Sequence, residues 1–213
     1  MTKRLLIFDL DGVLVNSERY HSAVCEELME EAAGRPVNTR EFHYPGIDTT
    51  ELYRIGLERT GSSGDPAMLM RRHFERTLER IRTAIPDPDP ELIRMLEDPR
   101  VLERTKYVAS SSPRSFVEAV LEMYGILPLF DRVLTGDDVE HLKPAPDIYL
   151  LALSLSGIPA GDAVAVEDSR TGSLAAQAAG IDCIGYRNPT SGDQDLSACF
   201  QQTSSLLRIP EWI

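Results

Sequence analysis

The stretch FDLDGVLVNSE, residues 8–18, decides the fold, because it closes the first apolar run of the chain, RLLIF at 4–8. A short apolar run that ends in polar residues is typical of a strand buried on both faces. Asp9 and Asp11 follow this strand two residues apart, so their side chains point to the same side of an extended chain. Taken alone, the two aspartates fit a turn or helix cap after a strand as well as they fit a functional site.

Four further apolar runs predict more buried strands: KYVAS at 106–110, RVLT at 132–135, AVAVE at 163–167 and CIGY at 183–186. From the second run onward they alternate with helix-like stretches at 114–124, 146–157 and 170–179. Strands that alternate with helices indicate an α/β fold, a doubly wound parallel (Rossmann-like) sheet with helices on both faces.

The interval between the first and second runs holds an insertion. Residues 9–105 lie there, whereas a crossover needs only about a dozen residues or more. Apolar residues at spacings of three to four predict amphipathic helices at 17–33, 48–60 and 65–83. The prolines of AIPDPDPE, 84–91, stiffen the chain and exclude helix until about Glu91. We therefore predict a core of residues 1–15 and 86–213 and a small α-helical domain of residues 16–85.

Composition excludes several classes of protein. The 213 residues suffice for a core and an inserted domain, and the formal net charge of −12 disfavours a nucleic-acid interface. No apolar run approaches the ~20 residues of a membrane helix, and the apolar start is too short for a signal peptide. The three cysteines have no CxxC spacing, which argues against a disulfide framework and a zinc site. We expect a cytoplasmic protein with reduced thiols, no membrane partner and a monomeric state.

Polar residues that follow the predicted strands are the candidates for a site, because ligands of an open parallel sheet bind beyond the carboxyl ends of its strands. Besides the two aspartates, these candidates are Ser110, Ser111, Glu167 and Asp168, with Lys143 before the helix that follows the third run.

Carboxylates from two strands crowd negative charge, which a divalent cation such as Mg²⁺ neutralises. Lys143 and the hydroxyl of Ser110, with backbone N–H groups at the next helix start, suit an anion. Metal and anion together indicate phosphate chemistry, with Asp9 as nucleophile and Asp11 as general acid and base. The alternative for Glu167 and Asp168 is a cap on the helix that begins near residue 169 or 170.

Four motifs occur in the order found in the haloacid dehalogenase-like superfamily, which the sequence resembles: FDLDG at 8–12, VASSS at 108–112, LKPAPD at 142–147 and VEDSRTG at 166–172. The resemblance implies an aspartyl nucleophile at Asp9, acid–base chemistry at Asp11, and phosphate contacts from the Ser110 and Ser111 segment and Lys143.

The same resemblance implies a magnesium ion held by Asp9, the backbone carbonyl of Asp11, and Asp168, with Glu167 binding the metal or orienting its waters. It also implies that residues 17–83 form a helical cap that selects the substrate, with hinges at NSE, 16–18, and at the proline segment.

The predicted cap contains two candidate substrate contacts, His21 and Gly46. His21 stands where β-phosphoglucomutases and many sugar phosphatases have a histidine, and Gly46 is expected at the cap's substrate-facing loop. The alternatives are a packing role for His21 and an ordinary loop glycine at Gly46. Phosphoglucomutases have a basic residue just before that glycine, but here it is Pro45.

The carboxylate at Asp11 favours phosphoryl transfer over dehalogenation, because a departing halide needs no proton. The sequence therefore predicts a Mg²⁺-dependent phosphatase that hydrolyses a small phosphorylated metabolite, a sugar phosphate or a phosphoglycolate-like monoester, through an aspartyl-phosphate. A β-phosphoglucomutase-like phosphoryl transferase and a non-catalytic binding protein remain alternatives.

Overall fold

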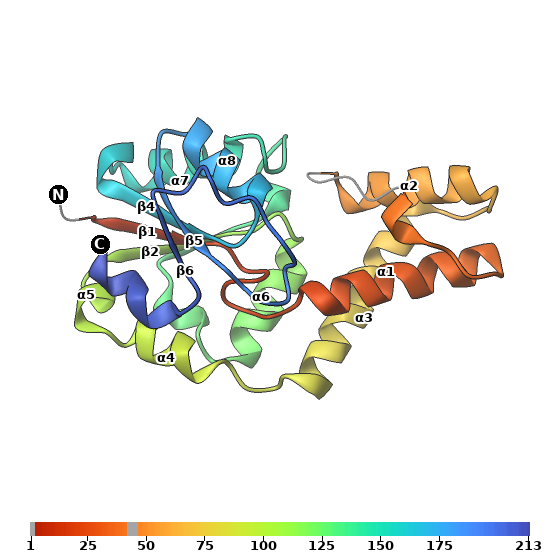
Figure 1. The fold of residues 1–213 in the computed structure, drawn as a ribbon, viewed down its shortest axis with the longest axis horizontal. Helices are drawn as coiled ribbons and strands as arrows, with labels where there is room; N and C mark the ends of the chain where they lie inside the picture. The colour runs from red at the N-terminus through yellow and green to blue at the C-terminus, as the bar shows by residue number, and fades with distance from the viewer. Residues whose placement is uncertain (1–2, 42–46) are drawn as a thin grey trace. The chain divides into compact units, whose positions relative to one another are not determined.

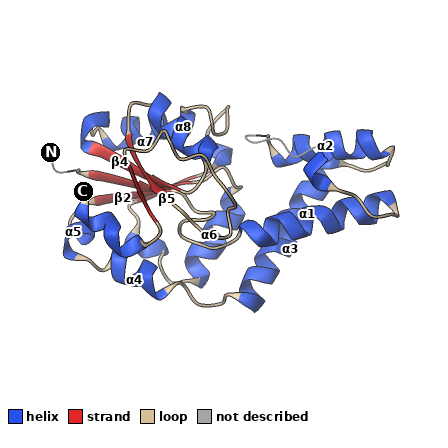
Figure 2. Cartoon of the chain, in the orientation of Figure 1, coloured by secondary structure: helices blue, strands red, loops and turns tan. Residues whose placement is uncertain are grey.

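The computed structural model describes residues 3–41 and 47–213, and the chain divides into two compact units. Met1–Asn16 and Pro86–Ile213 form the first, here called the sheet unit, and Ser17–Ile85 form the second, the helical unit. Figure 1 traces both along the chain, and Figure 2 shows that the strands belong to the sheet unit.

The sheet unit is built on six parallel strands in the order β3-β2-β1-β4-β5-β6, which confirms the predicted fold class. Their bounds are β1 Leu5–Phe8, β2 Thr105–Ala109, β3 Arg132–Leu134, β4 Ala163–Glu167, β5 Asp182–Tyr186 and β6 Gln201–Thr203. The strand order reverses between β1 and β4, and ligands of doubly wound folds bind at this switch point. The sheet therefore places the residues after β1 and β4 at its natural binding position.

Helices cover both faces of this sheet. They are α4 Pro90–Leu96, α5 Pro99–Leu102, α6 Arg114–Met123, α7 Asp147–Ser156 and α8 Arg170–Ala178, with short 3₁₀ turns at Leu127–Leu129, Gly136–Asp138, Ala160–Asp162 and Leu206–Glu211. Leu5 and Ile7 pack in one apolar cluster with residues of α7 and α8, and Figure 1 shows α4 and α6 on the opposite face. Helix α4 begins at Pro90. A proline is tolerated at this first helical position because it loses no hydrogen bond there.

The helical unit is inserted between β1 and β2 and consists of α1 Glu18–Ala33, a 3₁₀ turn Thr39–Glu41, α2 Thr49–Thr60 and α3 Pro66–Ala84. Aspartate side chains cap the last two helices, since Asp48 accepts from the Thr50 and Glu51 amides and Asp65 accepts from the Ala67 amide. The unit has an apolar cluster of its own, made by residues of all three helices and Val37.

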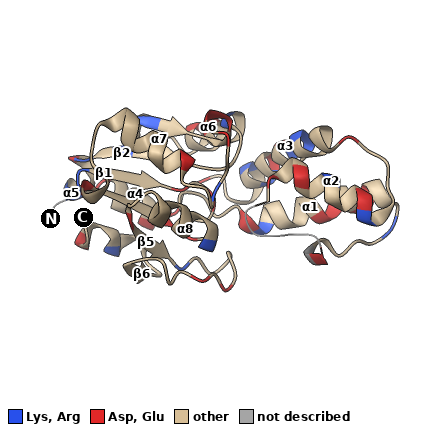
Figure 3. Cartoon of the chain, turned by 90° about the horizontal axis from the view of Figure 1, so that it is seen from above, with Lys and Arg blue, Asp and Glu red and all other residues tan. Residues whose placement is uncertain are grey.

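Ion pairs also join α1 to α3. Arg72 and Arg76 both donate to Glu31, and Arg80 donates to Glu27 with two contacts of 2.6 Å. Figure 3 shows basic positions on α3 and acidic positions on α1. Among the described residues, no helix is long and apolar enough to cross a membrane.

Candidate active site

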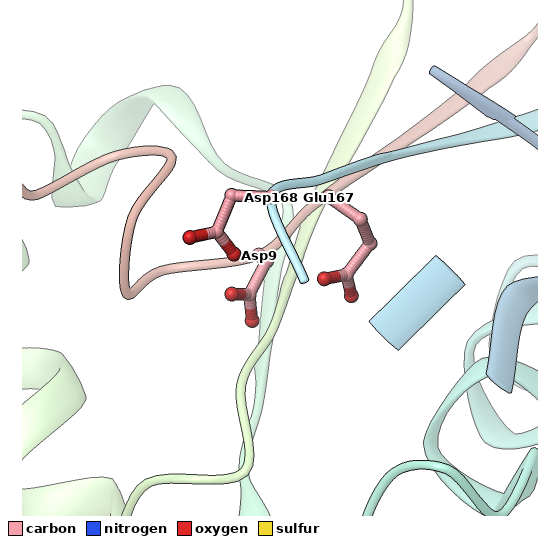
Figure 4. Close-up of side chains that lie close together, drawn as sticks. All are labelled: Asp9, Glu167 and Asp168. Atoms are coloured by element: carbon pink, nitrogen blue, oxygen red, sulfur yellow. The ribbon is translucent and has the colours of Figure 1, made fainter. Parts of the chain in front are cut away.

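Three carboxylates meet where β1 and β4 end. Asp9 directly follows β1, and its amide donates to the carbonyl of Val166 on β4 at 3.0 Å, so the two strand ends stay in register. Glu167 ends β4 and Asp168 follows it. One oxygen from each of the three carboxylates lies within 4.8 Å of the others, and all three side chains are buried. Figure 4 shows this acidic cluster, defined as Asp9, Glu167 and Asp168.

Lys143 connects two members of the acidic cluster. Its ammonium donates to Oδ1 of Asp9 at 2.7 Å and to Oε1 of Glu167 at 2.6 Å. A third bond of 2.7 Å goes to the carbonyl of Ala109, the last residue of β2. The lysine side chain is only 5% exposed, so these charges interact with little screening by water.

Glu167 is fixed from several directions. Its Oε1 also accepts a hydrogen bond from the buried hydroxyl of Tyr149 on α7. The carboxylate lies directly against Gly172 of α8, where a Cβ would be 1.8 Å from Oε2. Glu167 therefore sits in a closely fitted pocket that only a glycine at position 172 leaves open.

The electrostatics of the site follow from burial and from these neighbours. Burial raises the pKa of Asp9 well above its ordinary value, and the nearby Glu167 carboxylate raises it further, while Lys143 acts in the opposite direction. Burial alone lowers the pKa of Lys143, but the carboxylates of Asp9 and Glu167 outweigh burial and raise it, so the ammonium stays charged. Burial, then Glu167, raises the pKa of Tyr149, so its hydroxyl remains a donor.

Asp168 is positioned by a glycine and a serine. A Cβ on Gly12 would lie 1.8 Å from Oδ2 of Asp168, and Gly12 has a φ of +80°, which also favours glycine. Ser191, in the loop after β5, donates its hydroxyl to the same Oδ2. Asn188 of that loop donates to the carbonyl of Gly12 at 2.8 Å. The loop after β5 thus supports the end of β1 and the acidic cluster together.

Asp11 lies at the same edge of the sheet but makes a different contact. Its Oδ2 accepts a hydrogen bond of 2.8 Å from the hydroxyl of Ser112, in the segment after β2. Ser110 of that segment is buried, and its hydroxyl accepts from the Ser112 amide at 3.0 Å. Ser111 is exposed, and its carbonyl lies against Gly136, where a Cβ would be 2.5 Å away.

Helices α6 and α8 both begin close to candidate site residues in the sequence. Helix α6 begins at Arg114, and the amide of this residue donates to Asp137 at 2.9 Å. This N–H already has a partner within the chain, and the expectation that backbone amides at this helix start bind an anion stays a prediction. Helix α8 begins at Arg170 and is capped by Ser169, whose hydroxyl accepts from the Gly172 amide at 3.0 Å. Ser169, rather than either neighbouring carboxylate, supplies the observed side-chain cap.

Of the two cap candidates, the structure describes His21, which lies in the helical unit. His21, on α1, is partly buried and contacts His73 of α3, with 2.8 Å between Nδ1 of His21 and Nε2 of His73. Nδ1 of the buried His73 is in turn 2.9 Å from the hydroxyl of Tyr53 on α2. His21 thus combines packing with polar contacts, and both readings of its role stay predictions. Gly46 lies outside the described residues.

The donor set suits a hard divalent cation. The acidic cluster offers only oxygen ligands, the type that Mg²⁺ prefers. Three carboxylates face one ammonium, so ionisation of all three leaves an excess of buried negative charge. A cation bound among them would oppose the burial and repulsion that raise the pKa of Asp9. The residues present therefore fit the expected metal.

Several polar residues of the site were not anticipated from the sequence. They are Ser112, Tyr149, Asn188 and Ser191. Asn188 and Ser191 follow β5, so the rule that directs attention to the ends of strands would have found them had it been applied to the last predicted strand. Tyr149 stands in an apolar helix and reads as a core residue; only its hydroxyl, which needs a partner when buried, is a signal.

The chain is similar in sequence to known proteins. The family described as haloacid dehalogenase-like hydrolase matches residues 6–186. The chain is 28% identical over 183 residues to fructose-1-phosphate phosphatase YqaB of Escherichia coli, covering 85% of this chain and 95% of that protein. It is 33% identical over 193 residues to SUPPRESSOR OF QUENCHING 1 of Arabidopsis thaliana, covering 87% of this chain but only 18% of that protein.

Among solved structures, a mutant of CbbY from Rhodobacter sphaeroides, in complex with xylulose-(1,5)bisphosphate, superposes with a TM-score of 0.83. The match covers 97% of this chain and 96% of that chain at 24% sequence identity, and it shows a shared fold. The residues matched by the family include the whole acidic cluster and Lys143. The chain therefore belongs to the haloacid dehalogenase-like hydrolases, and it is related in sequence to their phosphatases.

Proposed function

We propose that the protein is a Mg²⁺-dependent phosphatase that hydrolyses the phosphate ester of a small phosphorylated sugar or a phosphoglycolate-like molecule. The observation that carries this proposal is the contact of Lys143 with Asp9 inside the acidic cluster, 2.7 Å between Nζ and Oδ1. A buried carboxylate, a buried ammonium and further oxygen ligands at one point are the components that phosphoryl transfer requires.

Asp9 is the proposed nucleophile. Its carboxylate attacks phosphorus, the bond from phosphorus to the ester oxygen breaks, and the phosphoryl group is carried as an aspartyl-phosphate. Asp11 gives a proton to the departing oxygen and then removes one from the water that hydrolyses the intermediate. The hydrogen bond from Ser112 orients the Asp11 carboxylate for both steps.

Lys143 screens negative charge on the transferring group. Because Glu167 and the Ala109 carbonyl share the ammonium, its position is set before substrate arrives. Tyr149 and Gly172 fix Glu167 in turn. We assign Glu167 chiefly to positioning Lys143. Binding the metal or orienting its waters is then a secondary role of Glu167.

The proposed metal ligands are Asp9, the backbone carbonyl of Asp11, and Asp168, with Glu167 beside them. When bound, Mg²⁺ supplies positive charge that lowers repulsion between an anionic nucleophile and an anionic phosphate. Ser191 and Gly12 hold the Asp168 carboxylate for this purpose. Ser110 and Ser111 are proposed to contact the substrate phosphate together with Lys143.

The helical unit is proposed to select the substrate as a cap, with His21 and Gly46 as contacts. His73 and Tyr53 support the side chain of His21 from within the unit and restrict its ring. Support for a sugar phosphate comes from YqaB, a fructose-1-phosphate phosphatase by name, and from CbbY, whose structure holds xylulose bisphosphate.

The direct test is phosphate release from a panel of phosphorylated metabolites, with Mg²⁺ and with a chelator. We expect at least one sugar phosphate or phosphoglycolate to be hydrolysed only with metal, and Asp9→Asn to lower kcat at least about 1,000-fold. Asp182→Asn is the matched control, because Asp182 opens β5 and pairs with Lys3 at 2.7 Å, away from the strand ends that carry the site.

The phosphatase and mutase readings differ in where the phosphoryl group ends. Incubation with β-glucose 1-phosphate and Mg²⁺ separates them, because a phosphatase releases free phosphate. Formation of glucose 6-phosphate without free phosphate would overturn the proposal. Full activity in Asp9→Asn would overturn the assignment of the nucleophile.

A further inference from the structure

Two of the three cysteines lie together in the sheet unit, one on β5 and one in the segment before β6. The Sγ atoms of Cys183 and Cys199 are 3.4 Å apart, although the residues are 16 positions apart in the chain. Cys183 belongs to β5, and its carbonyl accepts a hydrogen bond of 3.0 Å from the amide of Phe200. The pairing of β5 with β6 therefore brings Cys199, just before β6, to the side of Cys183.

A glycine makes room for this pair. Gly185 lies two residues after Cys183 on β5, so the two positions share one face of the strand. A Cβ on Gly185 would be 3.0 Å from Sγ of Cys199, a distance that real Cβ atoms rarely allow. The sulfur of Cys199 thus occupies space over β5 that a side chain would otherwise fill.

The remaining distance is small. A disulfide has an S–S bond of about 2.0 Å, so the sulfurs need to approach by only about 1.4 Å. Cys199 lies in the connection to β6, the edge strand, which pairs on one side only. This connection can move toward β5 without breaking the central ladder of the sheet.

The two thiols differ in access. Cys183 is 2% exposed, whereas Cys199 is partly exposed. A hydrogen bond with Cys183 also lowers the pKa of Cys199, and the thiolate is the reactive form of cysteine. A small oxidant therefore meets Cys199 first and leaves Cys183 beside it as the second thiol.

We propose that Cys199 and Cys183 form a reversible disulfide when the protein meets a peroxide. The sulfur of Cys199 attacks one peroxide oxygen, the O–O bond breaks, and a sulfenic acid and water result. The sulfur of Cys183 then attacks the sulfur of Cys199, the S–O bond breaks, and a second water leaves. The dithiol gives two electrons to the peroxide, and a dithiol reductant returns them.

The test uses the full chain and hydrogen peroxide. After treatment, iodoacetamide labelling of the chain unfolded in denaturant should find one free thiol where the reduced protein has three. The mass should fall by two hydrogen atoms, a non-reduced digest should join the peptides of Cys183 and Cys199, and dithiothreitol should restore all three thiols. Cys25→Ser is the matched control, since it removes a thiol of the helical unit and should leave the cross-link unchanged.

Cys183→Ser should abolish the cross-link and leave Cys199 to gain oxygen atoms. Three thiols that remain free at a peroxide dose that fully oxidises free cysteine would overturn the proposal. So would oxidation of Cys199 to higher acids in the unmutated chain, or cross-links between chains only. None of these readouts depends on phosphatase activity, so the two proposals fail independently.

Discussion

The carboxylate of Asp168 occupies the space that a side chain on Gly12 would need: a Cβ there would lie 1.8 Å from Oδ2. This close packing leaves no room for a side chain between the loop after β1 and the residue after β4. It makes the glycine of the DxDG sequence a requirement of the acidic cluster rather than of the turn alone.

Gly12→Ala should therefore lose most activity. Its matched control is Gly157→Ala, because Gly157 has a similar positive φ of +65° but no atom near its missing Cβ. Both variants should lose about 1 kcal/mol of stability from the strained backbone, but only Gly12→Ala should raise the Mg²⁺ concentration needed for half-maximal activity, by at least about tenfold. Equal metal dependence in the two variants would contradict this account.

Lys143→Met should lower both stability and activity. It leaves Asp9 and Glu167 without their shared cation, a change that costs about 3–5 kcal/mol for a buried pair, and kcat should fall at least about 100-fold. Lys106→Met is the control, because the buried Lys106 donates instead to main-chain carbonyls, including that of Arg104 at 2.8 Å. Urea unfolding and kcat should show that both lysines stabilise the protein and that only Lys143 serves catalysis.

Mg²⁺ should stabilise the folded chain. A ligand at 100 times its Kd adds about 2.7 kcal/mol, which for a chain of this size corresponds to roughly 5–10 °C in Tm. Asp168→Asn should lose most of this shift, while Asp182→Asn keeps it. Differential scanning calorimetry with and without Mg²⁺ measures the effect, and an unchanged shift in Asp168→Asn would remove this residue from the metal site.

Much of the fold is predictable from the sequence, because the strands of the sheet are apolar runs and the inserted helices have clear starts. Asp65 followed by Pro66, for example, marks the beginning of α3. The strand β6, with the sequence QQT, was missed. It is an edge strand with two exposed residues, so its backbone pairing leaves almost no apolar pattern.

The candidate site is also predictable only in part. Residues that follow strands, such as Asp9 and Asp168, are predictable because parallel strands bring their carboxyl ends to one edge. The contacts that hold them are not, because Tyr149 and Ser191 acquire their partners only when a helix and a loop pack against the sheet. Short motifs predict which catalytic groups are present. The contacts that hold those groups in place depend on the tertiary structure.

Cys25 should react slowly with thiol reagents. Burial raises its pKa to about 11, even though a hydrogen bond with Tyr53 lowers it in part. Relative to a thiol at the ordinary value of 9.0, the thiolate fraction near pH 8 falls roughly 100-fold, so alkylation should be slower by at least this factor.

The direction of the pH effect follows from the same pKa. The folded state holds this proton more tightly than the unfolded state, so its contribution to stability is present below pH 9.0 and is lost as the pH rises toward about 11. Peptide mapping after timed maleimide labelling gives the rate, which should increase about tenfold per pH unit over this range. A rate equal to that of Cys199, or one independent of pH, would contradict the prediction.

The helical unit has its own apolar cluster, and the chain leaves the sheet unit after Asn16 and re-enters it at Pro86. Its interior can therefore change without altering the core beneath the strand ends. Evolution, or an engineer, can therefore exchange this segment between relatives as a unit without changing the residues of the sheet unit. Under the proposed cap role, such an exchange would change the accepted substrate and leave the reacting groups of the sheet unit as they are.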